Sequence, residues 1–410
     1  MKKTFSFLLS LKGNAKSSVL TEPLWGIPFN LYAPFITLYM YHLGVMDFEI
    51  GIILFVGRLV QVIMALAGGV ITDKFGRRIT TLVGDCVSWS IPVLIWAFSQ
   101  NFWWFLAGAI VNGMWHITAI SWECLWMDDI PENQVGPIYN WIYISGLLAV
   151  FFSPIAGYFV AIYGVVPVTR VLYLFAFVSM TTKFILLYVF STETKRGIER
   201  MHATKNIPVM HMFKGYKDVM WQILKSKVMV KALVLQTALS IILMVTSTFF
   251  ALYATQNLFV PESFLAVFPM LRAGIMLVFL LFIQERLNKY KSRHVMLFGL
   301  GVYISAMVWL LIAPQYNLIW LAVYIALDAC AAALLLPRID ALVANSIDPE
   351  ERARIRSLFN MIIMAISGPF GILAGTLSDI DRRLPFALNI ILFLFMIVTA
   401  VLGKKENRYA

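Results

Sequence analysis

Charged residues are scarce in this chain of 410 residues: Asp, Glu, Lys and Arg make up 13% of it, and hydrophobic residues make up 60%. Soluble domains carry about a quarter charged residues and about half apolar ones. The composition therefore excludes a soluble enzyme and a disordered chain. It also excludes a transmembrane β-barrel, because the apolar stretches run unbroken over helix-length windows instead of alternating with polar residues.

Cysteines are few and nucleotide-binding motifs are lacking. The three cysteines, Cys86, Cys124 and Cys330, lie inside apolar runs without the spacing of metal ligands, so we expect neither a disulfide framework nor a metal site. No G-x-x-x-x-G-K-[ST] loop occurs, which disfavours a pump driven by ATP hydrolysis. We therefore predict no enzymatic activity and no cofactor.

Long apolar stretches are what the sequence has in abundance. A transmembrane helix needs about 20 apolar residues, and cutting the chain at charges, Pro and Asn predicts an all-α membrane protein with twelve transmembrane helices. These spans cover residues 19–43, 48–72, 79–98, 102–127, 138–163, 167–191, 230–255, 261–284, 294–313, 317–337, 356–378 and 384–402.

The distribution of Lys and Arg predicts the orientation of these spans. The segments on the side of the amino terminus carry 27 basic residues and the opposite side carries 3, and Lys and Arg accumulate in cytoplasmic loops. We expect a multi-pass protein of the cell membrane with both termini in the cytoplasm. Contact with anionic lipid headgroups explains the net charge of +11, so no nucleic-acid partner is expected.

The longest connection divides the chain into two halves. Residues 192–229 are polar at first and then amphipathic, which is typical of a helix in the headgroup layer. We predict an N-terminal six-helix bundle at 1–191, this cytoplasmic linker, and a C-terminal six-helix bundle at 230–410. Asp73–Arg77 aligns with Glu285–Lys289 at nearly the same offset as Arg58 with Arg272, which indicates two pseudo-symmetric repeats.

The loop between the second and third spans carries a family resemblance. Its residues Gly69-Val70-Ile71-Thr72-Asp73-Lys74-Phe75-Gly76-Arg77-Arg78 resemble the signature loop of the major facilitator superfamily, G-x-x-x-D-[RK]-x-G-[RX]-[RK]. The match is complete, and the resemblance covers the whole chain. It implies a monomeric secondary transporter that works by alternating access, with the signature loop closing the cytoplasmic side.

We therefore expect a cytoplasmic gate around the signature loop. Its basic residues can form ion pairs with acids at the end of the fourth span, where the loop lacks Lys and Arg. The alternative is that the loop only anchors a turn on the cytoplasmic side. Gly69 is expected to allow close helix contact and Gly76 a tight turn. The predicted gate residues are Gly69, Asp73, Gly76, Arg77, Arg78, Asp128, Asp129, Glu285 and Lys289, and Asp85 is assigned to the same network.

Small residues and prolines recur in the fifth and eleventh spans. Pro154 and Gly157 resemble the G-P-x-x-G-G run of antiporters in this superfamily with two glycines replaced, and Gly368 and Pro369 are their counterparts. They indicate either antiport or a generic hinge with tight packing. The arginine typical of the fourth span of proton-coupled exporters is replaced by Ala109, which disfavours a standard drug/proton antiport.

Three basic residues lie more than one helical turn inside the predicted spans: Arg58, Lys183 and Arg272. Arg58 and Arg272 occupy equivalent mid-membrane depths, where each charge costs at least about 2.5 kcal/mol. We expect the two guanidinium groups to bind an anionic solute from opposite halves. The alternative is that protein acids neutralise each Arg and lock helices together. Lys183, near the end of its span, is expected to extend to the membrane surface.

Two further residues are candidates for proton coupling. Asp328 lies near the middle of the tenth span, where desolvation favours a protonated carboxyl and a nearby Arg opposes it. His116 lies in the fourth span, and its alternative is a hydrogen-bonded place in helix packing. The solute cavity of the superfamily is lined by the first, fourth, seventh and tenth spans. The resemblance thereby adds Asn30, Tyr32, Trp115 and Gln236 as solute-binding candidates.

The sequence thus predicts a secondary active transporter for a small anionic solute, coupled to protons or a counter-anion and surrounded by membrane lipids. One alternative is an exporter of drugs or amphipathic molecules, which the Trp residues of the fourth span favour. Another is a membrane sensor that resembles a transporter.

Overall fold

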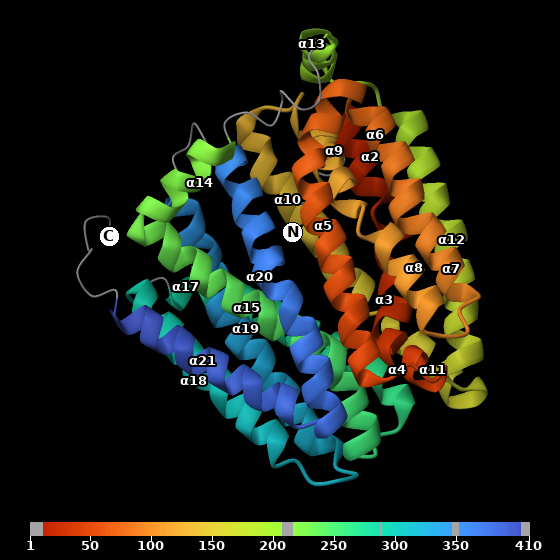
Figure 1. The fold of residues 1–410 in the computed structure, drawn as a ribbon, viewed down its shortest axis with the longest axis vertical. Helices are drawn as coiled ribbons and strands as arrows, with labels where there is room; N and C mark the ends of the chain where they lie inside the picture. Colours follow the sequence, from red (N-terminus) through yellow and green to blue (C-terminus); the bar gives the residue numbers. More distant parts are fainter. Residues whose placement is uncertain (1–10, 207–215, 288, 347–351, 403–410) are drawn as a thin grey trace. The chain divides into compact units, whose positions relative to one another are not determined.

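The computed structural model describes residues 11–206, 216–287, 289–346 and 352–402, and the secondary structure in these ranges is helical throughout, without a strand (Figure 1). This confirms the predicted all-α class. Ten helices among the described residues are long and apolar enough to cross a membrane. The two other predicted spans, 19–43 and 102–127, are helical but interrupted, so the structure is consistent with twelve spans.

Proline and glycine interrupt those two spans. The first span consists of α3 (Pro23–Tyr32), the 3₁₀ turn η1 (Ala33–Phe35) and α4 (Ile36–His42), and Pro34 in η1 lacks the N–H that a continuous helix needs. The fourth span consists of α8 (Phe102–Asn112) and α9 (Trp115–Met127). Gly113 lies at this break, where a Cβ would come within 2.8 Å of Val60.

The chain divides into two compact units. The described part of the first unit comprises residues 11–44 and 56–206, and that of the second comprises 45–55, 216–287, 289–346 and 352–402. The start of α5 therefore groups with the second unit, which the sequence did not indicate. The further helices of the first unit are α2 (Gly13–Thr21), most of α5 (Asp47–Phe75), α6 (Arg77–Asp85), the π-helical turn η2 (Cys86–Ser90), α7 (Ile91–Ala97), α10 (Glu132–Val150), α11 (Ser153–Tyr163), α12 (Val165–Phe190) and α13 (Lys195–Thr204).

The second unit is built in the same way. Its helices are α14 (Tyr216–Lys225), α15 (Lys227–Leu252), η4 (Tyr253–Asn257), η5 (Glu262–Ala266), α16 (Val267–Phe282), α17 (Gln284–Leu287), α18 (Ser292–Leu311), α19 (Leu318–Ser346), α20 (Arg352–Ile380) and α21 (Leu384–Leu402). The predicted amphipathic linker corresponds to α13 and α14, with residues 207–215 between them outside the described part.

The predicted hinge residues differ in their settings. Pro154 lies in the first turn of α11, directly after the chain leaves the α10 helix at Phe151 and Phe152, and Gly157 is buried in α11. Pro369 lies inside the continuous helix α20, and Gly368 beside it is buried. Only the first site therefore coincides with a break in the helix.

Glycines bring the start of α5 against α20 inside the second unit. A Cβ on Gly51 would lie 2.5 Å from the carbonyl oxygen of Gly371, and one on Gly375 would lie 2.6 Å from that of Asp47. The Asp47 carboxylate accepts hydrogen bonds from Ser378 Oγ at 2.6 Å and from Arg382 Nε at 3.0 Å. Small residues thus allow the backbones of α5 and α20 to touch. The buried carboxylate of Asp47 binds Ser378 and Arg382 at one end of this contact.

A pair of alanine substitutions tests this contact. We expect Gly51→Ala to destabilise the protein by about 1–3 kcal/mol, the usual cost of overpacking, because the added methyl group would meet backbone. Gly301→Ala is the matched control, since the same methyl group would meet nothing within 4 Å there. Thermal unfolding of the two detergent-solubilised variants measures the difference, and equal midpoints would contradict the described packing.

Candidate functional site

A carboxylate outside the signature loop shapes the turn within it. Gly76 separates α5 from α6 with a φ of 86°, a left-handed conformation that favours glycine, as the sequence indicated. The first two amide groups of α6, those of Arg77 and Arg78, donate to Glu193 Oε1 and Oε2 at 3.0 Å each. Glu193 therefore caps α6 and interacts favourably with the helix dipole. The sequence offered no signal for this partner, which lies more than 100 residues away.

Arg77 and Asp73 organise an ion-pair network around the loop. Arg77 is buried, and its Nε lies 3.0 Å from Asp128 Oδ2, the contact that the sequence predicted. Asp73 lies 3.2 Å from Arg77 and 2.6 Å from Arg200 of α13. The hydrogen bonds and the negative charge of Asp73 raise the pKa of Arg200. Thr194 Oγ1 also donates to Asp128, at 3.1 Å, so the start of the middle connection joins the network.

The remaining predicted gate residues contribute in different ways. Arg78 donates to the carbonyl of Tyr188 at 2.8 and 3.0 Å and lies 3.9 Å above its ring. Asp129 accepts a bond from the backbone of Lys195 at 3.3 Å. Lys289 is exposed, and the side chain of Glu285 lies outside the described residues. Whether these groups act as a gate stays a prediction.

Two expectations about this region are wrong. Gly69 does not make the close helix contact, because within the described structure nothing lies within 4 Å of where its Cβ would be. Its neighbour Gly68 makes the contact, 3.1 Å from the Cα of Ile117. Asp85 is not part of the ion-pair network either: it is buried at the end of α6, two turns from the loop.

The intramembrane Arg272 of the second unit has a protein partner. Its Nε lies 2.7 Å from Oδ2 of Asp328, whose side chain is 8% exposed. Tyr303 and Tyr324 lie within electrostatic range of Arg272. Asp328 therefore neutralises Arg272. For this arginine, the structure agrees with the alternative in which a protein acid neutralises the charge.

Arg58 of the first unit has no acidic partner in the part of the chain that the structure describes. Its Nη1 donates to Gln61 Oε1 at 3.1 Å, one turn further along α5. Among the residues that the structure describes, no carboxylate lies within ion-pairing distance of it. Arg58 is partly exposed and close enough to His116 for their charges to interact. It is thus an intramembrane cation with free hydrogen-bond donors.

A row of aromatic side chains extends from His116 in the first unit. The Trp115 ring lies 4.0 Å from that of His116 and 6.3 Å from that of Trp89. Trp89 meets Trp25 edge-on at 5.0 Å, and Trp25 stacks on Phe29 at 4.9 Å. All five members are partly exposed. We call Trp25, Phe29, Trp89, Trp115 and His116 the aromatic row; α3, η2 and α9 supply its members.

The other solute-binding candidates lie in less suitable places. Asn30 is partly exposed, but its amide donates to Gly26 of its own helix at 2.8 Å. Tyr32 is only 1% exposed and packs on Tyr173 at 4.8 Å between ring centroids, so it belongs to the interior of the first unit. Gln236 is partly exposed on α15 of the second unit. Sequence analysis missed Trp25, Phe29 and Trp89.

A double-mutant cycle tests the role of the Arg272–Asp328 pair. We expect Asp328→Asn to destabilise the protein by about 1.5–3 kcal/mol, because the partly exposed guanidinium of Arg272 loses a charge-assisted hydrogen bond and its counter-charge. Adding Arg272→Gln should restore most of this stability, and thermal unfolding of both single variants and the double variant measures it. Equal damage from the double and the single variants would contradict the pairing.

Comparison with solved structures agrees with this fold. The nucleoside transporter NupG superimposes with a TM-score of 0.73 at 14% identity, covering 97% of this chain and 100% of that one. The POT family transporter PepTSo gives a TM-score of 0.70 at 12% identity, covering 95% of this chain and 96% of that one. At these identities the similarity concerns the fold alone.

Named relatives are similar in sequence over parts of the chain. The multidrug resistance protein MdtG of Rahnella sp. (strain Y9602) is 28% identical over 151 residues, 35% of this chain and 36% of that protein. The match therefore spans about a third of the length of MdtG. The tetracycline resistance protein, class B, of Escherichia coli is 21% identical over 318 residues, 75% of this chain and 73% of that protein.

The family comparison covers most of the chain. The family described as "MFS_1 like family" matches residues 29–386, a range that includes the signature loop, Arg58, the ion pair of the second unit and nearly all of the aromatic row. The solved neighbours are transporters by name, and the protein belongs to this MFS_1 like family of the major facilitator superfamily.

Proposed function

We propose that this transporter moves a small aromatic solute that carries a negative charge, by alternating access and with coupling to protons or a counter-anion. The observation that carries the proposal is the juxtaposition of the aromatic row with Arg58, an intramembrane guanidinium that has no counter-charge among the described residues. The membrane is the bacterial inner membrane, with both termini in the cytoplasm.

The charge of Arg58 favours an anionic partner. An arginine in the middle of a membrane helix costs about 2.5–3.5 kcal/mol on insertion scales, and such residues mark solute or ion pathways. Only one hydrogen bond, to Gln61, occupies the guanidinium among the described residues. Its planar fork fits a carboxylate, sulfonate or phosphate group in a bidentate manner. Arg272, which Asp328 neutralises, is the less suitable partner, so the anion site centres on one arginine and not on a symmetric pair.

The aromatic row favours a ring-containing solute. Partly exposed Trp and Phe side chains bury large apolar area, and each aromatic pair in stacked or edge-on geometry contributes about 0.5–1.5 kcal/mol beyond that burial. The rings of Trp115 and His116 connect Arg58 with Trp89 and Trp25. A solute with a ring and an anionic group could therefore contact both features.

An exporter of drug-like molecules is the second candidate. The aromatic row accepts such molecules, and two relatives are named for multidrug and tetracycline resistance. An unpaired Arg58 disfavours cationic drugs, since like charges repel in a low-dielectric site. The charge of the preferred solute therefore separates the two candidates.

A charge series on one ring tests the proposal. We expect purified protein in proteoliposomes to bind benzenesulfonate more tightly than benzenesulfonamide, and phenyltrimethylammonium least, as measured by quenching of tryptophan fluorescence. Arg58→Gln should abolish the preference for the anion, a loss of about 10–100-fold in affinity, because a charge-assisted hydrogen bond contributes about 1.5–3 kcal/mol. Uptake of labelled benzenesulfonate under an imposed pH gradient tests transport itself.

Arg196→Gln is the matched control, because it makes the same chemical change on an exposed arginine of α13. Trp89→Ala should weaken binding of all three probes alike. An undiminished preference for benzenesulfonate in Arg58→Gln would refute the anion site, and a preference for phenyltrimethylammonium would favour the drug exporter.

A further inference from the structure

A second group of buried charges lies in the first unit. Lys183 of α12 is 5% exposed, and its Nζ lies 2.9 Å from Oε2 of Glu22, at the junction of α2 and α3. Asp85, the last residue of α6, is 6% exposed and lies within electrostatic range of both. The sequence-based expectation that Lys183 extends to the membrane surface is therefore wrong. Lys183 stays buried because its ammonium group pairs with Glu22. We call Glu22, Asp85 and Lys183 the buried triad.

Apolar and aromatic groups surround the triad. The Lys183 ammonium lies 5.5 Å from the ring centroid of Trp122, 5.8 Å from that of Trp25 and 5.9 Å from that of Phe184. No other charged group of the described residues acts on Asp85. Of the remaining neighbours, α9 contributes the uncharged Thr118 and η2 contributes the adjoining thiol of Cys86.

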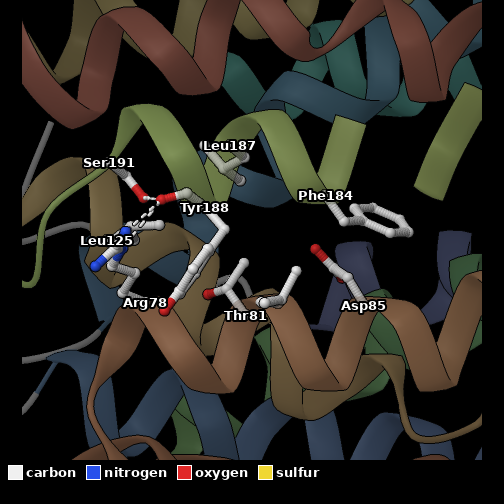
Figure 2. A pocket seen from close by; sticks show the side chains of 9 residues that line it. Arg78, Thr81, Asp85, Leu125, Phe184, Leu187, Tyr188 and Ser191 are labelled. Atoms are coloured by element: carbon white, nitrogen blue, oxygen red, sulfur yellow. Dashed lines mark hydrogen bonds between the residues drawn. The ribbon is translucent and has the colours of Figure 1, made fainter. Parts of the chain in front are cut away.

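A narrow gap links Asp85 of the triad with the signature loop. It runs along the seam between α6 and α12, and Figure 2 shows Asp85 beside Phe184 at one end and Arg78, bonded to Tyr188, at the other. The gap does not admit a water molecule in this conformation. The Asp85 carboxyl group is therefore not hydrated on this face. The other titratable groups that line the gap are Arg78 and Tyr188, at the opposite end. Arg78 and Asp85 are seven residues apart and so lie on the same face of α6.

The charges of the triad do not balance. Two carboxylates and one ammonium leave one negative charge when all three groups are ionised, and an unbalanced charge in apolar surroundings is costly. Binding of one proton to a carboxylate oxygen makes the triad neutral without moving any side chain. The Arg272–Asp328 pair differs, because it is neutral already and a proton on Asp328 would leave Arg272 without its counter-charge.

We propose that Glu22, Asp85 and Lys183 form a proton-binding site, which takes up one proton from water onto the two carboxylates and releases it again during the transport cycle. The coupling of this proton to transport rests on the proposed function, whereas the binding itself does not. Helix α6 begins with the last residues of the signature loop, Arg77 and Arg78, and ends with Asp85. A change in the charge of the triad therefore acts on one end of the helix whose other end Glu193 caps.

Site-specific labelling tests proton binding without any solute. Dicyclohexylcarbodiimide reacts with protonated carboxyl groups in apolar surroundings, and peptide mass spectrometry locates the adduct. In the wild-type protein in lipid vesicles, we expect labelling at Glu22 or Asp85 that falls about tenfold per pH unit on the alkaline side of the titration. Asp328 serves as the internal comparison and should stay unlabelled, because its carboxylate is already paired with Arg272.

Two variants separate proton binding from a structural role. Asp85→Asn leaves Glu22 and Lys183 as a neutral pair, so labelling of Glu22 should be lost at every pH. Lys183→Met removes the only cation, so labelling should increase and persist to more alkaline pH. Asp381→Asn, the same chemical change on an exposed carboxylate, should leave labelling unaltered. Absence of labelling at both carboxyls in the wild type and in Lys183→Met, or labelling that does not depend on pH, would overturn the proposal.

A transport measurement then tests the coupling. With benzenesulfonate as the probe, Asp85→Asn should abolish accumulation driven by a pH gradient while retaining exchange of labelled for unlabelled probe. Accumulation at the wild-type level in Asp85→Asn would overturn the role in coupling. If benzenesulfonate is not transported at all, the proposed solute class fails, and the labelling result decides the proton site independently.

Discussion

The cost of a charge in hydrocarbon is the constraint on which the functional features of this protein depend. Three basic residues lie more than one helical turn inside the predicted spans, and the structure gives each a different environment. Arg272 is paired with Asp328, Lys183 is paired with Glu22 within electrostatic range of Asp85, and Arg58 has no acid among the described residues. Each environment implies a different chemistry: structural pairing, exchange of a proton, and recognition of an anion.

The two proposals for the first unit fit one structural plan. Trp25 belongs to the aromatic row and also faces the ammonium of Lys183 at 5.8 Å. A solute stacked on the row would therefore lie near the buried triad, and the charge of the triad would act on a bound anion. A negative triad repels an anion and a neutral one does not, which gives a physical reason why proton and anion would move together.

Hydropathy and charge were sufficient to predict the fold, because every membrane helix must bury its backbone within about 20 apolar residues. The breaks at Pro34 and Gly113 were not predicted, since a hydropathy window does not detect a single interrupted turn. The contact between Arg77 and Asp128 could be predicted because both residues belong to loops with clear charge patterns. The pairing of Lys183 with Glu22 could not, because 161 residues separate them and a single sequence carries no information on which helices meet.

The start of the middle connection, residues 192–204, makes more hydrogen bonds and ion pairs with the first unit than its polar sequence suggests. Arg200 binds Asp73, and Thr204 Oγ1 donates to the Asp73 carbonyl at 3.1 Å, while Glu193 holds the start of α6. A protein of two separately expressed fragments should therefore be divided beyond Thr204. A division directly after the sixth span would remove from the amino-terminal fragment the groups that order its signature turn.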